Sequence, residues 1–505
     1  MNSLIARYAN RNTSHPIAIF PLLFLFSVIM LSLFIGLAIG LEQNKLLVVL
    51  FGGLGGVMLL FLTTQTLLIS TLVITIFIVG QLTYFAGIKQ ALWIPYGLGL
   101  LFFLKLPDTY LKNNKLVYTG STTISLWVTV FIAMVFISAL LNMTPLMQIV
   151  VGSKNIIFLW SLYFLIAWGG ISSEMIDTLW KKFSWLVLFQ VPILLYQYLV
   201  IAPSRSAQGG KFGVSWDAVV GGFGGDPMSG GASGTLAFFL VVGLLYFTSL
   251  LKHGLIPIHK YAFFCITILF CLLLAEVKVV VLLVPVGLGV IFAGSILRHT
   301  FKFFFSSVFI VAILLSILVV YEYQKNEVRG HVQNPFDLNV VLDKSFGYSF
   351  DSNVINFETR EMGRLAAITH WWEENGFEEP LHSVFGYGPG ASRIQSTFAV
   401  GEVAKKYPFN INRSALTQLL WEVGLVGVVV FIIILLKASI LSYKVSSTKN
   451  ISPHRQANLE TNAAALMMLI VMLPYGRDVL EVPSLTVFMM FMLGMAEHLN
   501  KEIKQ

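Results

Sequence analysis

Charged residues are scarce in this chain. They make up 11% of its 505 residues, against about 25% in a typical soluble domain, and 56% of the residues are apolar. This balance excludes an ordinary soluble enzyme and indicates a polytopic membrane protein. The two cysteines, Cys265 and Cys271, lie in one apolar run, six residues apart on different helix faces, so neither a disulfide nor a metal site is expected.

Motifs for nucleotides and metals are also missing. The sequence holds no P-loop, no GxGxxG after a strand, no HExxH and no CxxC pair, so we expect no cofactor and no metal. The net charge of +8 is explained by its distribution along the chain and does not indicate nucleic-acid binding. No internal repeat is visible.

What the sequence does have is long apolar runs. A membrane-spanning helix needs about 20 mostly apolar residues. By this measure about 14 runs are candidate spans. They lie near 17–40, 46–64, 67–86, 90–104, 121–141, 155–170, 183–201, 231–251, 261–276, 279–297, 302–320, 414–436, 461–475 and 483–498. The first run is long enough to span and has no small-residue cleavage site, so we expect a retained helix and not a signal peptide.

The distribution of basic residues supports this topology. With the N-terminus in the cytoplasm, 17 of the 33 Lys and Arg residues fall at inner positions and 7 in short outer loops. The remaining 9 lie in one long outer segment. We therefore expect both termini to be cytoplasmic. The predicted organisation is 11 spans in 1–320 with a small outer loop at 202–229, a large extracytoplasmic loop at 321–413, and three spans in 414–505.

Charged residues at the outer membrane boundary are the first functional candidates, because an ionisable group at membrane depth is costly. Arg and Lys together suit a diphosphate, since Arg offers a planar fork and Lys a point charge. Gly221–Gly225 and Gly386–Gly390 could add backbone N–H donors. The predicted diphosphate- or sugar-binding cations are Arg205, Lys211, Lys278, Arg360, Arg364 and Arg413.

Each candidate also has a purely structural interpretation. Lys278 could reach to the membrane surface, or pair with Glu276 to close a tight turn between two helices. Arg360 and Arg364, four residues apart in a charged helix-like run that begins at Glu358, could lie on a solvated helix face. Glycine-rich segments are often simple turns. The Trp pair after His370 could stack on sugars or anchor the loop at the membrane interface.

Three motifs carry a family resemblance. The first is Asp217-Ala-Val-Val-Gly-Gly-Phe-Gly-Gly-Asp226-Pro. The second is Leu274-Ala-Glu276-Val-Lys278, with Val277 and Lys278 in place of a Ser-Arg or Ser-Lys turn. The third and most specific is Phe385-Gly-Tyr-Gly-Pro-Gly390 followed by Leu419-Leu-Trp-Glu422-Val-Gly-Leu-Val-Gly427. Over about 190–430 the chain resembles the bacterial O-antigen polymerase and O-antigen ligase family, whose members have a large periplasmic loop.

The resemblance implies an all-α, GT-C-like glycosyltransferase of the bacterial inner membrane. Its substrate would be an oligosaccharide on undecaprenyl diphosphate, transferred to a second lipid-linked repeat at the outer face, without metal or nucleotide sugar. A chain-length regulator and a flippase would be partners in polysaccharide synthesis. The proton acceptor would be one of Glu358, Asp217 and His370, which the sequence leaves open.

One departure bears on the type of enzyme. Ligases of the family commonly carry a His nine residues before the Glu matched by Glu422, and here that position is Arg413. An Arg cannot act as a base at neutral pH. This favours a polymerase over a ligase acting on lipid A core or on protein. A flippase or solute transporter remains the alternative of a different class, although transporters tend to show internal repeats and midplane polar sites; a scaffold of a polysaccharide complex is a further alternative.

Overall fold

The fold is that of a computed structural model, which describes a large part of the chain. The described residues are 58–59, 61–112, 123–207, 218–227, 231–275, 277–298, 316, 319, 351, 355–357, 360–394, 400–448 and 451–504. Contacts divide the chain into two compact units, Met1–Thr63 and Thr64–Gln505. All elements below belong to the second unit.

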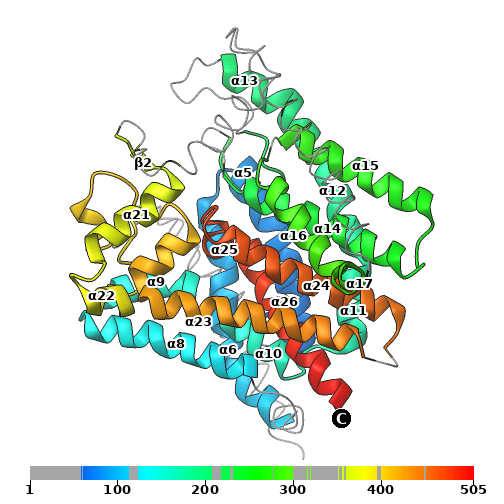
Figure 1. Ribbon diagram of the computed structural model, residues 1–505, viewed down its shortest axis with the longest axis horizontal. Coiled ribbons are helices and arrows are strands. Elements are labelled where there is room, and N and C mark those ends of the chain that lie inside the picture. Colours follow the sequence, from blue (N-terminus) through cyan, green and yellow to red (C-terminus); the bar gives the residue numbers. More distant parts are fainter. Residues whose placement is uncertain are drawn as a thin grey trace, which may run out of the picture. The chain divides into compact units, whose positions relative to one another are not determined.

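Helices dominate the described residues (Figure 1). In the first part they are α4 (Thr64–Val73), the π-helix η1 (Ile74–Val79), α5 (Gly80–Phe85), the 3-10 helix η2 (Lys89–Trp93), α6 (Ile94–Lys112), α8 (Thr123–Leu141), α9 (Leu146–Ile156), α10 (Trp160–Ala167), α11 (Ser173–Lys181), α12 (Phe183–Tyr196), the π-helix η3 (Gln197–Ile201), α13 (Ala202–Ala207), α14 (Ser233–Lys252), α15 (Ile258–Ala275), α16 (Val280–Ile291) and α17 (Ala293–Arg298). In the second part they are α21 (Arg364–Asn375), α22 (Pro380–Phe385), the 3-10 helix η6 (Ala404–Lys406), α23 (Ala415–Ser446), α24 (Pro453–Met472), α25 (Asp478–Glu481) and α26 (Pro483–Lys504).

The helices confirm the all-α, membrane-spanning character expected from the sequence. Six described helical segments are long and apolar enough to cross a membrane, or seven if the bent pair α9–α10 is one span. They are 64–85, 124–141, 173–204, 233–252, 258–275 and 415–446. The predicted spans at 90–104, 279–297, 461–475 and 483–498 also coincide with helices. Those at 17–40, and nearly all of 46–64 and 302–320, lie outside the described residues.

The core is built around α23 and α24, which pack on each other and on α8, α14, α16 and α26. Figure 1 shows α8 and α23 running side by side. α23 begins with a capping box, in which the Ser414 hydroxyl accepts from the Thr417 N–H and the Thr417 hydroxyl accepts from the Ser414 N–H. α14 is apolar nearly all round and is buried along most of its length, as expected for a helix enclosed by others.

Two sets of ion pairs mark the two ends of α24. Near its start, Arg455 pairs with Asp177 at 2.9 Å and Glu460 with Lys252 at 2.7 Å. Just beyond its other end, Arg477 pairs with Glu481 at 3.5 Å. A 20-residue helix is about 30 Å long, roughly the thickness of a bilayer core. The two charged sets are therefore separated by about one membrane thickness.

One expectation about the outer segment is wrong. The helix-like run expected from Glu358 begins only at Arg364, and it is preceded by a short antiparallel pair, β1 (Ile355–Asn356) and β2 (Glu361–Met362). Arg360 lies in the connecting turn with φ of 57°, a left-handed conformation outside any helix. Arg360 and Arg364 therefore do not share a helix face.

Candidate active site

The turn after α24 is the meeting point of the outer segment and the spanning helices. The N–H of Ala415 donates to the carbonyl of Gly476, and the N–H of Leu416 donates to that of Leu473, both at 2.9 Å. These bonds satisfy donors at the start of α23, which has no intrahelical partners for them. The Arg364 guanidinium, at the start of α21, donates to the carbonyl of Tyr475. The turn thus joins α21, α23 and α24.

Two of the predicted cations come together at this turn. The guanidinium of Arg364 lies 4.0 Å from the centre of the Tyr475 ring, a stacking geometry that Arg favours. Arg413 also lies within electrostatic range of the Tyr475 hydroxyl. The sequence spacing of 49 residues gives no hint of this proximity. It follows from the docking of α21 on the α24–α25 turn.

Arg413 is held by an acidic neighbour. Its Nη1 lies 3.3 Å from Oε1 of Glu361, the first residue of β2. The Glu361 side chain is 41% exposed, so water reaches this pair and weakens it. An anion of higher charge could compete with Glu361 for Arg413, because a guanidinium binds a phosphate through two parallel hydrogen bonds.

A second charged group lies deeper and centres on Arg393. Its Nε is 3.7 Å from Oε1 of Glu422 and its Nη2 is 3.9 Å from Oε1 of Glu481. Glu422 is fully buried in α23, and its Oε1 also accepts from the Ser392 hydroxyl at 2.8 Å. Isolated carboxylates are rarely buried, so Arg393 is the group that makes the burial of Glu422 possible.

Further side chains complete this group. Asn155, with its amide turned to donate to the Tyr96 hydroxyl, accepts from the Arg393 guanidinium at 2.7 and 3.2 Å. Lys154, beside it on α9, places its ammonium 4.1 Å from the Trp93 ring centre and acts electrostatically with Arg393 and Glu481. α9 therefore supplies a cation and an amide to the same cluster.

Asp478, just after this turn, has a structural partner in Thr235. Oδ2 of Asp478 accepts from the Thr235 N–H at 2.7 Å and from the Thr235 hydroxyl at 3.0 Å. Thr235 lies in the first turn of α14, where N–H groups lack intrahelical partners, so Asp478 caps that helix from another element. Desolvation raises the pKa of the Asp478 carboxyl, while the bonds from Thr235 oppose the rise.

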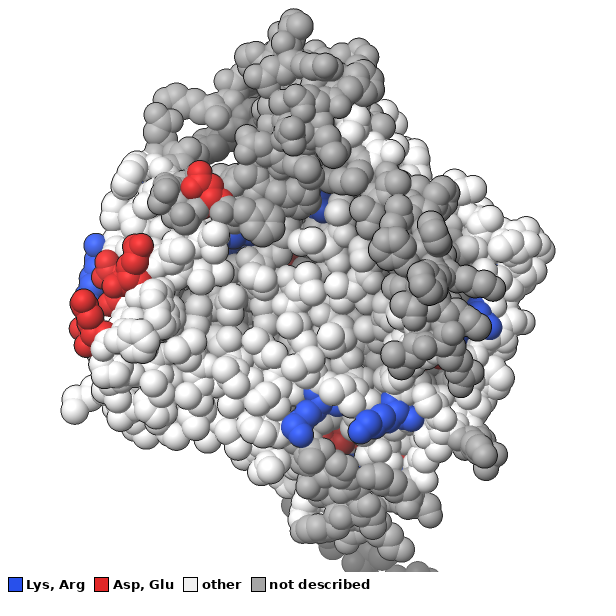
Figure 2. All heavy atoms as spheres, in the orientation of Figure 1, with Lys and Arg blue, Asp and Glu red and all other residues white. Residues whose placement is uncertain are grey.

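The charges of the cluster nearly balance. Five cations, Arg364, Arg393, Arg413, Arg477 and Lys154, share it with four carboxylates, Glu361, Glu422, Glu481 and Asp478. Figure 2 shows large uncharged areas on the described part of this face and acidic side chains at the edge where α21 and α22 lie. An anion that bound among these described residues would have to displace a carboxylate such as Glu361, because their charges nearly cancel.

The two glycine-rich turns use their N–H groups internally. In Gly386–Gly390 the N–H groups of Tyr387 and Gly388 donate to the carbonyls of Trp421 and Glu422, and that of Gly386 donates to His382. In the other turn the N–H groups of Val220, Gly221 and Gly222 donate to the buried side chains of Gln197 and Gln190. These donors therefore favour the interpretation as turns over that as anion sites.

The structure describes two of the four remaining predicted cations with their side chains. Lys278 is half-buried in the turn between α15 and α16, as expected, and Arg360 is exposed. The side chain of Arg205, on α13, and Lys211, Asp217, Glu276 and Glu358 lie outside the described residues. Their roles stay predictions.

His370 lies within an aromatic cluster. Its ring centre is 4.9 Å from that of Tyr407, 5.4 Å from that of Phe409 and 6.2 Å from that of Trp421. Desolvation lowers the pKa of the imidazole, although Glu374 and Glu373 act in the opposite direction. The ring is thus neutral at pH 7, the state that a base requires. Its contacts give it a packing role in addition to any chemical one.

Sequence reasoning missed Arg393 and Lys154 as members of the site. Neither belongs to a motif, and their contacts with Glu422 and Glu481 are tertiary. The available signal was their common placement on the outer boundary together with a Glu expected inside a spanning helix, since a buried carboxylate needs a cation. No family model matches the chain, and no curated protein matches it.

Proposed function

We propose that the protein is a polysaccharide repeat-unit polymerase, a GT-C-like membrane glycosyltransferase with about 14 spans. It would transfer an undecaprenyl-diphosphate-linked oligosaccharide to a second lipid-linked repeat at the outer face of a bacterial inner membrane. The observation that carries the proposal is the contact of Arg364 with Tyr475, with Arg413 within electrostatic range of the same side chain, where the spanning helices meet the outer segment.

The proposed chemistry is the one that the family resemblance implies. The acceptor hydroxyl attacks the anomeric carbon, the bond from that carbon to the diphosphate oxygen breaks, and the lipid diphosphate leaves. The acceptor proton passes to a base, for which Glu358, Asp217 and His370 are the candidates. Negative charge grows on the leaving oxygen in the transition state, so preorganised cations accelerate its departure. Arg364 and Arg413 are the cations best placed to do so, with Lys278, Arg360, Arg205 and Lys211 as further members.

The test compares polymer made in a deletion strain that carries single variants. Lys278→Ala and Arg413→Ala should abolish long polymer while the protein stays in the membrane. Lys405→Ala is the matched control, because Lys405 is an exposed cation of the same outer segment, 3.9 Å from Glu402. Unchanged polymer length and amount in both site variants would remove these residues from the site. Lipid-linked single repeats, followed by mass spectrometry, should accumulate in the inactive strains.

A further inference from the structure

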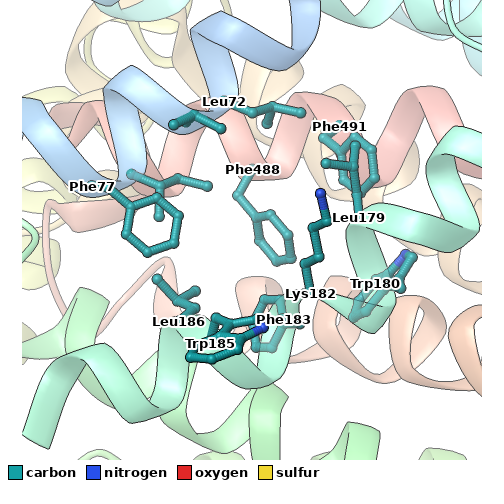
Figure 3. Close-up of a pocket in the computed structure, with 12 residues that line it drawn as sticks. Leu72, Phe77, Leu179, Trp180, Lys182, Phe183, Trp185, Leu186, Phe488 and Phe491 are labelled. Carbon is teal, nitrogen blue, oxygen red and sulfur yellow. The ribbon is translucent and has the colours of Figure 1, made fainter.

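An apolar groove of about 390 Å³ opens between α4, the π-helix η1, the helices α11 and α12, and α26 (Figure 3). Its lining is aliphatic and aromatic except for one ammonium group. The lining residues are Leu72, Val73, Ile76, Phe77, Leu179, Trp180, Lys182, Phe183, Trp185, Leu186, Phe488 and Phe491. Such a surface suits a hydrocarbon chain and offers little to a polar solute.

The groove belongs to the membrane-spanning part of the chain. Two of its walls, 64–85 and 173–204, are segments apolar and long enough to span. It is open at one side, where Val73 is 43% exposed and Trp185 is 68% exposed. In a bilayer an exposed apolar surface on such helices contacts lipid, and a Trp at its edge is typical of the interface.

Lys182, the one charged residue of the lining, lies on the side of the groove that carries the ion pair of Asp177. Lys182 directly follows α11, and α11 carries Asp177, the partner of Arg455 at the start of α24. Arg477 lies beyond the other end of that helix, about 30 Å away by helix length. A headgroup held at Lys182 would therefore lie on the Asp177 side of the groove, away from Arg477.

Charge at the groove selects the kind of lipid. Lys181 and Lys182 are both exposed, and no carboxylate of the described residues forms an ion pair with either. Figure 3 shows the Lys182 side chain extending into the groove from the side of α12. A lysine near the membrane surface attracts anionic headgroups. We propose that the groove binds one acyl chain of an anionic glycerophospholipid, whose phosphate pairs with Lys182. This inference is independent of the proposed transferase activity.

The test is a lipid titration of the purified full-length protein by native mass spectrometry. We compare phosphatidylglycerol with phosphatidylcholine of the same acyl chains. Each protein molecule should bind one phosphatidylglycerol with higher affinity than any phosphatidylcholine. Lys182→Ala should weaken phosphatidylglycerol binding about fivefold, the effect of about one surface lysine. Lys260→Ala, which removes an exposed lysine from the start of α15, is the control and should change nothing.

A second variant tests the groove itself. Val73→Trp should fill it and abolish the tight binding without changing the charge. Because Lys182 is exposed, Lys182→Ala should preserve the packing of the protein. Its lipid affinity therefore still tests the proposal if Val73→Trp cannot be purified. Equal affinity for the two lipids, equal losses in Lys182→Ala and Lys260→Ala, or full binding by a folded Val73→Trp would each overturn the proposal.

Discussion

Gly386 and Gly424 lie backbone to backbone. A Cβ added to Gly386 would come within 2.7 Å of the Gly424 nitrogen, and one added to Gly424 within 2.6 Å of the Gly386 nitrogen. Both residues adopt nearly the same conformation, with φ and ψ of 71° and −169° in one and 69° and −173° in the other. Only glycine adopts these φ and ψ angles without strain. The most specific sequence motif is therefore a single packing unit that joins the outer segment to α23.

This contact predicts a stability effect. Gly424→Ala should destabilise the protein by at least 1–3 kcal/mol, roughly the backbone strain alone, with the steric clash in addition. Thermal unfolding in detergent, followed by loss of the monodisperse species, measures it. Gly289→Ala is the control, because nothing lies within 4 Å of a Cβ added there. Equal melting temperatures of the two variants would contradict the packing described here.

A second prediction concerns the buried pair of Arg393 and Glu422. Arg393→Met leaves the Glu422 carboxylate buried without its cation, which should cost about 3–5 kcal/mol. Glu422→Gln in the same chain removes the buried charge and should restore most of the loss. The coupling is read from melting temperatures of the two single variants and the double variant. If the two losses simply add, the pair contributes no interaction energy.

The ion pair of Arg413 and Glu361 predicts a change in substrate affinity. Glu361→Gln removes a carboxylate 3.3 Å from the guanidinium, so a diphosphate would no longer compete for it. The KM for the lipid-linked donor should fall several-fold, which corresponds to the free energy of a partly exposed ion pair. Glu402→Gln, at an exposed pair in the same outer segment, should leave KM unchanged. A raised KM in Glu361→Gln would show that Glu361 supports binding.

His370 predicts a dependence of stability on pH. Because desolvation lowers its pKa in the folded state, the unfolded state binds a proton first as the pH falls. His370 therefore destabilises the fold as the pH drops below its usual value of about 6.5. His370→Phe should keep the aromatic packing and lose less stability between pH 7 and pH 5 than the unaltered protein. His259→Phe, at an exposed position of α15, should follow the unaltered protein. Identical pH profiles for all three would argue against a desolvated imidazole.

Six or seven of the predicted spans are found as long apolar helices among the described residues, and they were predictable because their signal is local. Apolar runs predict the helices. The placement of basic residues in alternate loops fits the two sets of ion pairs at opposite ends of α24. The start of α21 was not predictable in this way, because Arg360 and Glu361 are as compatible with a helix as with the turn and strand that they form. The docking of Asn410, whose N–H donates to the Arg360 carbonyl at 2.9 Å, helps to decide between the two.

Tertiary contacts explain what else the sequence left open. Arg393 and Glu422 are 29 positions apart and belong to a loop and a spanning helix, so no periodicity links them. Lys154 reaches them from a helix more than 200 positions earlier. Conversely, the two glycine-rich turns were predicted as anion sites on the assumption that their N–H groups are free. The hydrogen bonds of these groups to Trp421, Gln190 and Gln197 cannot be read from the sequence.

The most direct test of the proposed function uses purified protein in liposomes with a synthetic undecaprenyl-diphosphate oligosaccharide as the only substrate. We expect a ladder of lipid-linked oligomers and release of undecaprenyl diphosphate, with both lost in Arg413→Ala and retained in Lys405→Ala. A folded, unaltered protein that forms no oligomer from this substrate, or an Arg413→Ala variant that forms the full ladder, would contradict it.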